Sequence, residues 1–243
     1  MPNITVKDLT LNYKDGNGFT PALSGVNALF LSEKFNCIIG PSGSGKTTLL
    51  KCLAGLLPYD GEITFDGVSV NGLKPFERNL SLVTQEFALY PHMTVFDNIA
   101  FPLKNAGARR EEIVKRVERI ADVLDLKYCL TRKPRHISGG QKQRAALARA
   151  LIKNPLVCLF DEPLSNVDPQ MRFKERRFLK NAMASFGCTA VFVTHDVLEA
   201  TALADKLFVM DGGKIVLQGD VNEVYNSDDP VMTALRTESE QKW

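Results

Sequence analysis

The hydrophobic residues of this chain follow two periods, which fall in different parts of the sequence. Short continuous apolar runs, each followed by glycine or polar residues, occur at Phe35–Ile39, Val157–Phe160 and Ala190–Val193. Runs of this length and kind predict buried parallel strands. From about Arg109 to Leu126 the apolar residues recur instead at helical spacing. The pattern therefore predicts an α/β core that is interrupted by a helical segment, which we set at roughly 86–154.

Turn signals add a second kind of β-structure to this picture. Asp66-Gly67 lies between two β-prone runs, and Asp211-Gly212-Gly213 lies between two more. Aspartate followed by glycine in such a setting predicts a tight hairpin. We therefore expect an antiparallel β portion beside the core.

The stretch Gly40-Pro41-Ser42-Gly43-Ser44-Gly45-Lys46-Thr47 matches the phosphate-binding pattern G-x-x-x-x-G-K-[ST]. It follows a predicted strand and opens a helix-like run, Thr48 to Leu57, which is the context that this pattern requires. Glycines let successive backbone N–H groups curl around a phosphate, and the helix N-terminus adds the positive end of its dipole. Lys46 is expected to reach the β- and γ-phosphates, and the Thr47 hydroxyl to bind Mg²⁺.

Two adjacent carboxylates follow the apolar strand that starts at Val157. Asp161 is expected to face the Mg²⁺ ion, and Glu162 to orient or deprotonate an attacking water. A simple transition from strand to turn would also explain the pair. The phosphate loop upstream favours the catalytic interpretation.

A second glycine-rich stretch, Ser138-Gly139-Gly140-Gln141, opens a predicted helix that runs to about Lys153 and is stopped by Asn154-Pro155. A serine cap with free amides behind it suits an anion, although it also suits an ordinary loop. With Ile137 in front, the stretch resembles the LSGGQ signature of ABC ATPases, in which leucine is usual at that position. The order of the motifs along nearly the whole chain is similar to that family.

The resemblance implies roles for residues that composition and spacing alone leave open. It implies that ATP is bound by Tyr13, Gly40, Pro41, Ser42, Gly43, Ser44, Gly45, Lys46, Thr47 and Thr48. It implies that Mg²⁺ is held by Thr47, Gln85 and Asp161, and that Glu162, His195, Gln85 and Lys46 are catalytic. It also implies that Ser138, Gly139, Gly140 and Gln141 act on the ATP of a second ATPase subunit, in a homodimer or a heterodimer. The loop Leu164–Asp168, with Asp168, resembles the loop that crosses the dimer interface in that family; by itself it would read as a turn. Tyr13 could also be no more than a half-buried sheet residue.

The fold that the resemblance implies is a P-loop NTPase core of the RecA-like α/β type. It has an antiparallel β subdomain and an inserted α-helical subdomain that carries the signature. In this sequence we expect a single ABC ATPase domain, with its core in 1–85 and 155–243 and its helical subdomain in 86–154.

The segment 86–103 resembles ATPases of maltose-type bacterial sugar importers. In those systems this region receives a helix from the transmembrane permease subunits. Phe87, Leu89, Tyr90, Phe96 and Phe101 could bury such a helix, or could be ordinary subdomain core. The sequence stops where maltose-type ATPases add a C-terminal regulatory domain, so we expect that domain to be missing.

We therefore expect the ATP-hydrolysing subunit of a bacterial solute importer that also has an extracytoplasmic solute-binding protein. The alternatives are an exporter or lipoprotein-extraction ATPase and, from another functional class, a soluble ABC protein without a transport role.

Composition limits the other functions. The 243 residues carry a net charge of +2, which gives no reason to expect a nucleic-acid partner. The five cysteines form no C-x-x-C pair and are expected to be reduced and buried. Neither a signal peptide nor an 18-residue apolar run is found, so we expect a cytoplasmic protein that lies peripherally on the inner face of the membrane.

Overall fold

Two separate β-sheets form the framework of the chain in the computed structural model, which describes residues 1–16, 18–165 and 167–240. The four-stranded sheet has the order β2-β1-β4-β5, and the six-stranded sheet has the order β10-β9-β3-β8-β7-β6. The first sheet consists of β1 (Ile4–Asp15), β2 (Gly18–Phe30), β4 (Asp60–Phe65) and β5 (Val68–Ser69). The second consists of β3 (Phe35–Ile39), β6 (Leu80–Val83), β7 (Val157–Asp161), β8 (Thr189–Val193), β9 (Lys206–Asp211) and β10 (Lys214–Asp220).

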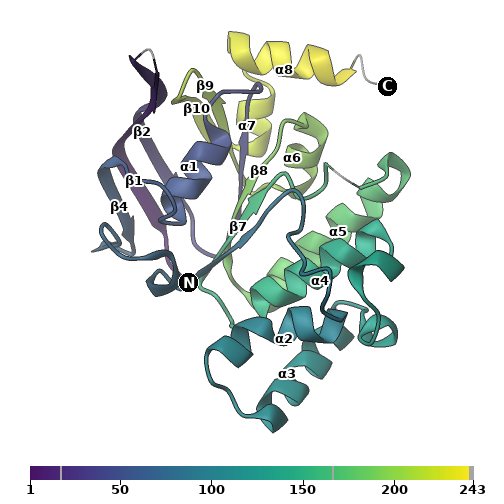
Figure 1. Cartoon of the computed structure of the whole chain (residues 1–243). Helices are drawn as coiled ribbons and strands as arrows, with labels where there is room; N and C mark the ends of the chain where they lie inside the picture. The colour runs from purple at the N-terminus through teal and green to yellow at the C-terminus, as the bar shows by residue number, and fades with distance from the viewer. Residues whose placement is uncertain (17, 166, 241–243) are drawn as a thin grey trace.

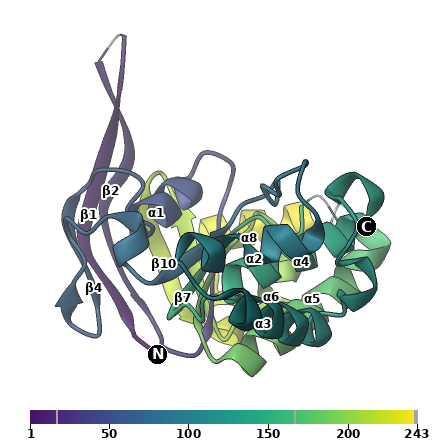
Figure 2. The same ribbon diagram turned by 60° about the horizontal axis from the view of Figure 1, so that its bottom comes forward.

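The helices are grouped around the six-stranded sheet (Figure 1). They are α1 (Lys46–Leu53), α2 (Val95–Asn105), α3 (Arg110–Val123), α4 (Gly139–Leu151), α5 (Pro169–Phe186), α6 (Val197–Leu203), α7 (Val221–Tyr225) and α8 (Pro230–Glu240). Helices α2 to α5 lie on the side of the molecule away from the four-stranded sheet, and α1 lies between the two sheets. Figure 2 shows β1 and β2 extending away from the rest of the chain toward their connecting turn. The expected α/β class with an antiparallel sheet and a helical segment is confirmed.

The central strands β3, β7 and β8 are buried on both faces of the six-stranded sheet, and alternate residues of β3 and β7 point to opposite sides. On β3, Cys37 and Ile39 pack with the helices α2 to α6, whereas Ile38 packs with α1 and the four-stranded sheet. On β7, Cys158 and Phe160 likewise face the helices. This two-sided burial is why these strands read as continuous apolar runs rather than as alternating ones.

The two predicted hairpins form, but only one lies in the antiparallel sheet. Phe65 pairs with Val68 across the first turn, within the four-stranded sheet. The second hairpin, β9–β10, extends the six-stranded sheet because β9 pairs in parallel with β3, with Leu207 opposite Cys37. The expectation that both hairpins belong to one antiparallel portion is therefore wrong for β9–β10.

Helix α1 begins and ends earlier than the predicted run from Thr48 to Leu57. Gly45 adopts a left-handed conformation (φ 101°), so the helix begins at Lys46. At the other end Gly55 is left-handed (φ 72°), Gly55 N donates to Cys52 O, and Leu56 N donates to Lys51 O. This paired arrangement is a Schellman motif, which terminates the helix.

The helical segment is inserted between two neighbouring strands of the sheet. β6 and β7 pair in parallel, with Leu80 opposite Val157, and α2, α3 and α4 lie between them in sequence. Helix α3 ends at Val123, before the predicted Leu126, and α4 ends at Leu151 because Asn154 turns left-handed (φ 52°). Helix α2 was not predicted from the sequence; Thr94 caps it by accepting a hydrogen bond from Asp97 N.

Candidate functional site

The phosphate loop lies between the buried strand β3 and the first turn of α1. A β-carbon on Gly45 would lie 2.5 Å from the Ala22 carbonyl oxygen, so no larger residue fits without movement of the backbone. Among the described residues, no side chain caps the N-terminus of α1 at Gly45. The first N–H groups of this helix therefore remain available to bind an anion.

Lys46 is folded into the loop that precedes it. Its Nζ donates hydrogen bonds to Gly40 O (2.9 Å), Pro41 O (2.8 Å) and Ser44 Oγ (3.3 Å). Burial lowers the pKa of Lys46, against the opposing charges of Glu162 and Asp161. An ammonium group has three donors, so a phosphate oxygen would have to replace one of these partners.

Thr47 and Asp161 meet across the gap between α1 and β7. The Thr47 hydroxyl donates to Asp161 Oδ1 at 2.8 Å. Burial raises the pKa of Asp161, and the hydrogen bond from Thr47 opposes that rise. A hydroxyl and a carboxylate are hard oxygen donors of the kind that Mg²⁺ accepts together with phosphate oxygens. Within residues 1–16, 18–165 and 167–240, no group of three or more His, Cys, Asp and Glu forms a protein-only metal site.

The remaining polar groups follow three neighbouring strands and lie at one edge of the sheet. Gln85 follows β6, Glu162 follows β7 and His195 follows β8, and the three strands are parallel. His195 Nδ1 lies 3.0 Å from Glu162 Oε2. Glu162 adopts a left-handed conformation (φ 47°), and its N–H donates to Val193 O at 3.0 Å. The carboxyl ends of adjacent parallel strands are where open α/β sheets bind ligands.

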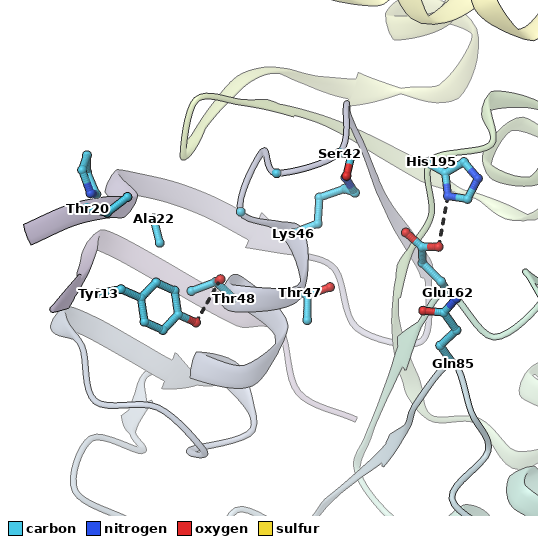
Figure 3. Close-up of a pocket in the computed structure, with 13 residues that line it drawn as sticks. Tyr13, Thr20, Ala22, Ser42, Lys46, Thr47, Thr48, Gln85, Glu162 and His195 are labelled. Carbon is cyan, nitrogen blue, oxygen red and sulfur yellow. Dashed lines mark hydrogen bonds and ion pairs between the residues drawn. The ribbon is translucent and has the colours of Figure 1, made fainter. Parts of the chain in front are cut away.

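One cavity of about 680 Å³ brings most of the predicted site together (Figure 3). It is lined by Tyr13, Ser42, Gly43, Gly45, Lys46, Thr47, Thr48, Gln85, Glu162 and His195 from the predicted set. Gly40, Pro41 and Ser44 contact Lys46, and Asp161 contacts Thr47. The geometry therefore unites the phosphate loop with carboxylate and histidine groups that lie more than 100 residues from it in sequence.

Tyr13 lies at the far end of this cavity from Glu162 and His195 (Figure 3). Its side chain is 43% exposed, and its hydroxyl lies 3.4 Å from Thr48 Oγ1. The same end is lined by Thr20, Pro21 and Ala22 of β2, because Tyr13 pairs with Thr20 across the hairpin. Sequence reasoning missed these three residues, since they belong to no motif and only strand pairing brings them there.

The glycine-rich stretch at the start of α4 lines a different cavity, of about 360 Å³. Ser138 Oγ accepts a hydrogen bond from Gln141 N, and Gln141 Oε1 accepts one from Ser138 N, which is a capping box. Asp168 lines this second cavity with Ser138, Gly139, Gly140 and Gln141. Asn166, in the loop before Asp168, lies outside the described residues. The two cavities have no lining residue in common, so within one chain these five residues are separate from the phosphate loop.

The second cavity also contains charged residues that sequence patterns did not identify. Arg144 pairs with Glu175 at 2.9 Å and with Asp125 at 3.2 Å, and its guanidinium lies 4.1 Å from the centre of the Phe178 ring. A charge on a helix usually indicates a solvated face. Only the packing of α4 against α5 shows that the charged side chain of Arg144 is largely buried.

The aromatic cluster of segment 86–103 is largely packed inside the chain. Phe87 is buried in the core, and Leu89 and Phe96 pack against that core. The rings of Tyr90 and Phe101 lie 4.7 Å apart. Of the two interpretations left open above, subdomain core therefore accounts for much of this cluster.

A profile of the ABC transporter family matches residues 23–165, more than half of the chain. The chain belongs to the ABC transporter family. It is 44% identical to the sn-glycerol-3-phosphate import ATP-binding protein UgpC of Rhizobium meliloti (strain 1021), over 93% of this chain and 64% of that protein. It is 45% identical to UgpC 1 of Rhizobium johnstonii, over 93% of this chain and 60% of that protein.

Solved structures agree with this family membership. The dimeric structure of MJ0796, described as a bacterial ABC transporter cassette, matches with a TM-score of 0.79 at 32% identity, over 90% of this chain and 98% of that one. A post-hydrolysis state of MJ0796 bound to ADP and Pi matches with a TM-score of 0.78. The chain spans less than two thirds of the length of the two UgpC relatives. No helix in the part of the chain that the structure describes is long and apolar enough to cross a membrane.

Proposed function

We propose that this chain is the ATP-binding and ATP-hydrolysing subunit of a bacterial solute importer. The single observation that carries the proposal is the cavity that combines the phosphate loop, the Thr47–Asp161 pair and the Glu162–His195 pair. The likeness to import ATP-binding proteins supports the importer branch. Residues 1–85 and 155–243 would form the nucleotide-binding core, and 86–154 the helical subdomain.

In this proposal the phosphate loop, Gly40 to Thr48, binds the phosphates of ATP and Tyr13 stacks on adenine. The size of the cavity, with the loop in its middle and Tyr13 at one end, supports this orientation. Lys46 exchanges a carbonyl partner for a phosphate oxygen. Mg²⁺, held by Thr47, Asp161 and Gln85, would neutralise phosphate charge.

Glu162 is the proposed general base for the attacking water. Its carboxylate lies in the cavity, and the contact with His195 restricts its orientation. A carboxylate within hydrogen-bond reach of a water can accept the proton that the water loses as it attacks the γ-phosphate. His195 and Lys46 would then stabilise charge on the transferred group.

The separation of the two cavities supports a site shared between two copies. Ser138 to Gln141 and Asp168 line the second cavity, and none of them lines the cavity that holds the chain's own phosphate loop. A head-to-tail pair would bring the second cavity of one subunit to the first cavity of the other, and the likeness to a dimeric cassette supports this arrangement. ATP would then close the pair, and hydrolysis would reopen it.

The proposed partners are transmembrane permease subunits, which bind through the exposed part of 86–103, and an extracytoplasmic solute-binding protein. The chain would lie at the cytoplasmic face of the membrane. The names of the relatives make a phosphorylated polyol one candidate solute, although an energy-supplying subunit need not touch its cargo.

The proposal is tested with the purified chain and two variants. Glu162→Gln should bind ATP as tightly as wild type, hydrolyse it about 100-fold or more slowly, and accumulate as an ATP-dependent dimer. Lys46→Ala should lose ATP binding. Undiminished hydrolysis by Glu162→Gln, or unchanged ATP affinity of Lys46→Ala, would refute the assigned site.

A further inference from the structure

The loop that follows Gln85 is held by an arginine from another element. Arg149 lies in the last turn of α4, and its Nη1 donates to Ala88 O at 2.7 Å while its Nη2 donates to Phe87 O at 2.8 Å. Its guanidinium also lies 5.5 Å from the centre of the Tyr90 ring. One planar cation thus binds two successive carbonyls and an aromatic face, which is the geometry that arginine has and lysine lacks.

The backbone that Arg149 binds has a conformation that its residues disfavour. Phe87 and Ala88 both have positive φ, 60° and 44°, although neither is glycine. Phe87 N donates to Thr84 O at 2.9 Å, which closes a turn with Gln85 inside it. Consecutive left-handed residues with β-carbons persist only where their surroundings hold them. The two charge-assisted hydrogen bonds from Arg149 provide that hold.

The same end of α4 is attached to the strand that leads into this turn. Ser81, on β6, donates from its hydroxyl to Ala150 O at 2.7 Å. Burial lowers the pKa of Arg149, and Tyr90 opposes that change. A guanidinium stays charged in proteins, so burying part of it costs free energy unless its N–H groups are hydrogen-bonded, as those of Arg149 are here. The contact is therefore specific, and it connects α4 to the turn that carries Gln85.

We propose that Arg149 is a positioning residue for Gln85. By fixing the carbonyls of Phe87 and Ala88, it holds the turn in the form that directs Gln85 into the nucleotide cavity. Because Ser138, which caps the N-terminus of α4, lines the second cavity, a movement of that helix is carried to Gln85 in the first. The expected effect of Arg149 on the rate of ATP hydrolysis rests on the proposed function. The expected effect on the conformation of the turn at residues 85–88 does not.

The test compares Arg149→Ala and Arg149→Lys with Arg116→Ala in wild-type and Gln85→Ala backgrounds. Arg116 is the matched control because it also donates to a backbone carbonyl, Ile152 O at 2.6 Å, at the end of α4. Arg149→Ala should lower kcat for ATP at least about tenfold with little change in KM, since small displacements of a catalytic group cost up to about 100-fold. Arg149→Lys should restore part of the rate, and Arg116→Ala should stay within about twofold of wild type.

Two measurements decide whether Arg149 acts by positioning Gln85. In the Gln85→Ala background, the further loss from Arg149→Ala should shrink to less than about twofold, because a residue that acts through Gln85 has nothing left to position. Amide hydrogen exchange at residues 85–88 should be faster in Arg149→Ala than in Arg116→Ala. Equal fold-losses in both backgrounds, or unchanged exchange in a folded Arg149→Ala or Arg149→Lys protein, would overturn the inference. If the wild-type chain does not hydrolyse ATP, the proposed function fails, and the exchange measurement still decides the role of Arg149.

Discussion

Arg144 and Glu175 form a buried ion pair that joins the first turns of α4 to α5. Arg144 Nη2 lies 2.9 Å from Glu175 Oε1 and Nε lies 3.3 Å from Oε2, so both carboxylate oxygens are bound. The two side chains are only 11% and 2% exposed. A β-carbon on Gly140 would lie 3.2 Å from Glu175 Oε1, so the pair lies directly against the glycine-rich stretch. The glycine at this position thus leaves room for a carboxylate that Arg144 neutralises.

Breaking this pair should destabilise the chain strongly. Glu175→Ala leaves the Arg144 charge poorly compensated, with only the Asp125 contact, and we expect a loss of about 3 kcal/mol in the free energy of unfolding, measured by urea denaturation. The control is Lys127→Ala, which breaks the exposed Lys127–Asp122 pair of 2.7 Å and should cost less than about 1 kcal/mol. Equal losses for the two variants would show that burial of the Arg144 pair has no special effect.

Two glycines of the phosphate loop should respond differently to the same substitution. Gly43 (φ 80°) has open space where a β-carbon would lie, so Gly43→Ala should cost about 1–2 kcal/mol, the strain of a left-handed alanine. Gly45→Ala adds a collision with the Ala22 carbonyl and should cost clearly more, with loss of ATP binding. Unfolding curves and ATP titrations on the two variants provide the measurement, and similar stabilities would contradict the close approach of β2.

The pH dependence of stability should reveal the buried carboxyl of Glu199. Burial raises its pKa above 4.5, Asp196 adds to the rise, and a 2.9 Å hydrogen bond from Thr194 opposes it. Between the unfolded and folded pKa values the folded state binds more protons than the unfolded state. Stability from this group is therefore lost as the pH rises through that window, and the loss is complete above the folded pKa.

Glu199→Gln removes this titration while keeping an oxygen that Thr194 can bind. Relative to wild type, the variant should gain stability as the pH rises from 4.5 through the folded pKa of Glu199, with a slope of at most about 1.4 kcal/mol per pH unit. Urea unfolding at a series of pH values measures the difference. A difference that is constant across the series would show that folding does not raise the pKa of Glu199.

The Thr47–Asp161 contact predicts how ATP hydrolysis depends on magnesium. Thr47→Val keeps the side-chain volume and removes the hydroxyl, so the Mg²⁺ concentration for half-maximal turnover should rise about tenfold, equivalent to one lost ligand interaction. Thr47→Ser retains the hydroxyl and should behave as wild type, and a chelator should stop turnover in all three proteins. A normal Mg²⁺ requirement in Thr47→Val would exclude this hydroxyl from the metal site.

Sequence patterns predicted the local parts of this protein well. The strand Phe35–Ile39, the glycine-rich loop after it and the serine cap at Ser138 depend on neighbouring residues, and they form where they were predicted. The boundaries of helices were less accurate. Helix α1 starts two residues earlier than predicted because the conformation of Gly45, which packs against β2, decides its first residue. Helix α2 lies within the predicted helical segment 86–154, but it was not itself predicted, because its apolar and aromatic residues were weighed only as a partner surface or as subdomain core.

The amino-acid sequence by itself determined the chemistry of this protein: a loop that suits phosphate, two carboxylates after a buried strand, and a histidine after another. Each of these is a local property, since residue type and spacing decide it. Only the tertiary structure decided which groups meet. Parallel pairing of β6, β7 and β8 brings Gln85, Glu162 and His195 to one edge, whereas Ser138, in the helical segment inserted between β6 and β7, lines a separate cavity. The Arg149 contact with Phe87 and Ala88 likewise spans about 60 residues, and no local pattern predicts it because it depends on how α4 packs beside β6.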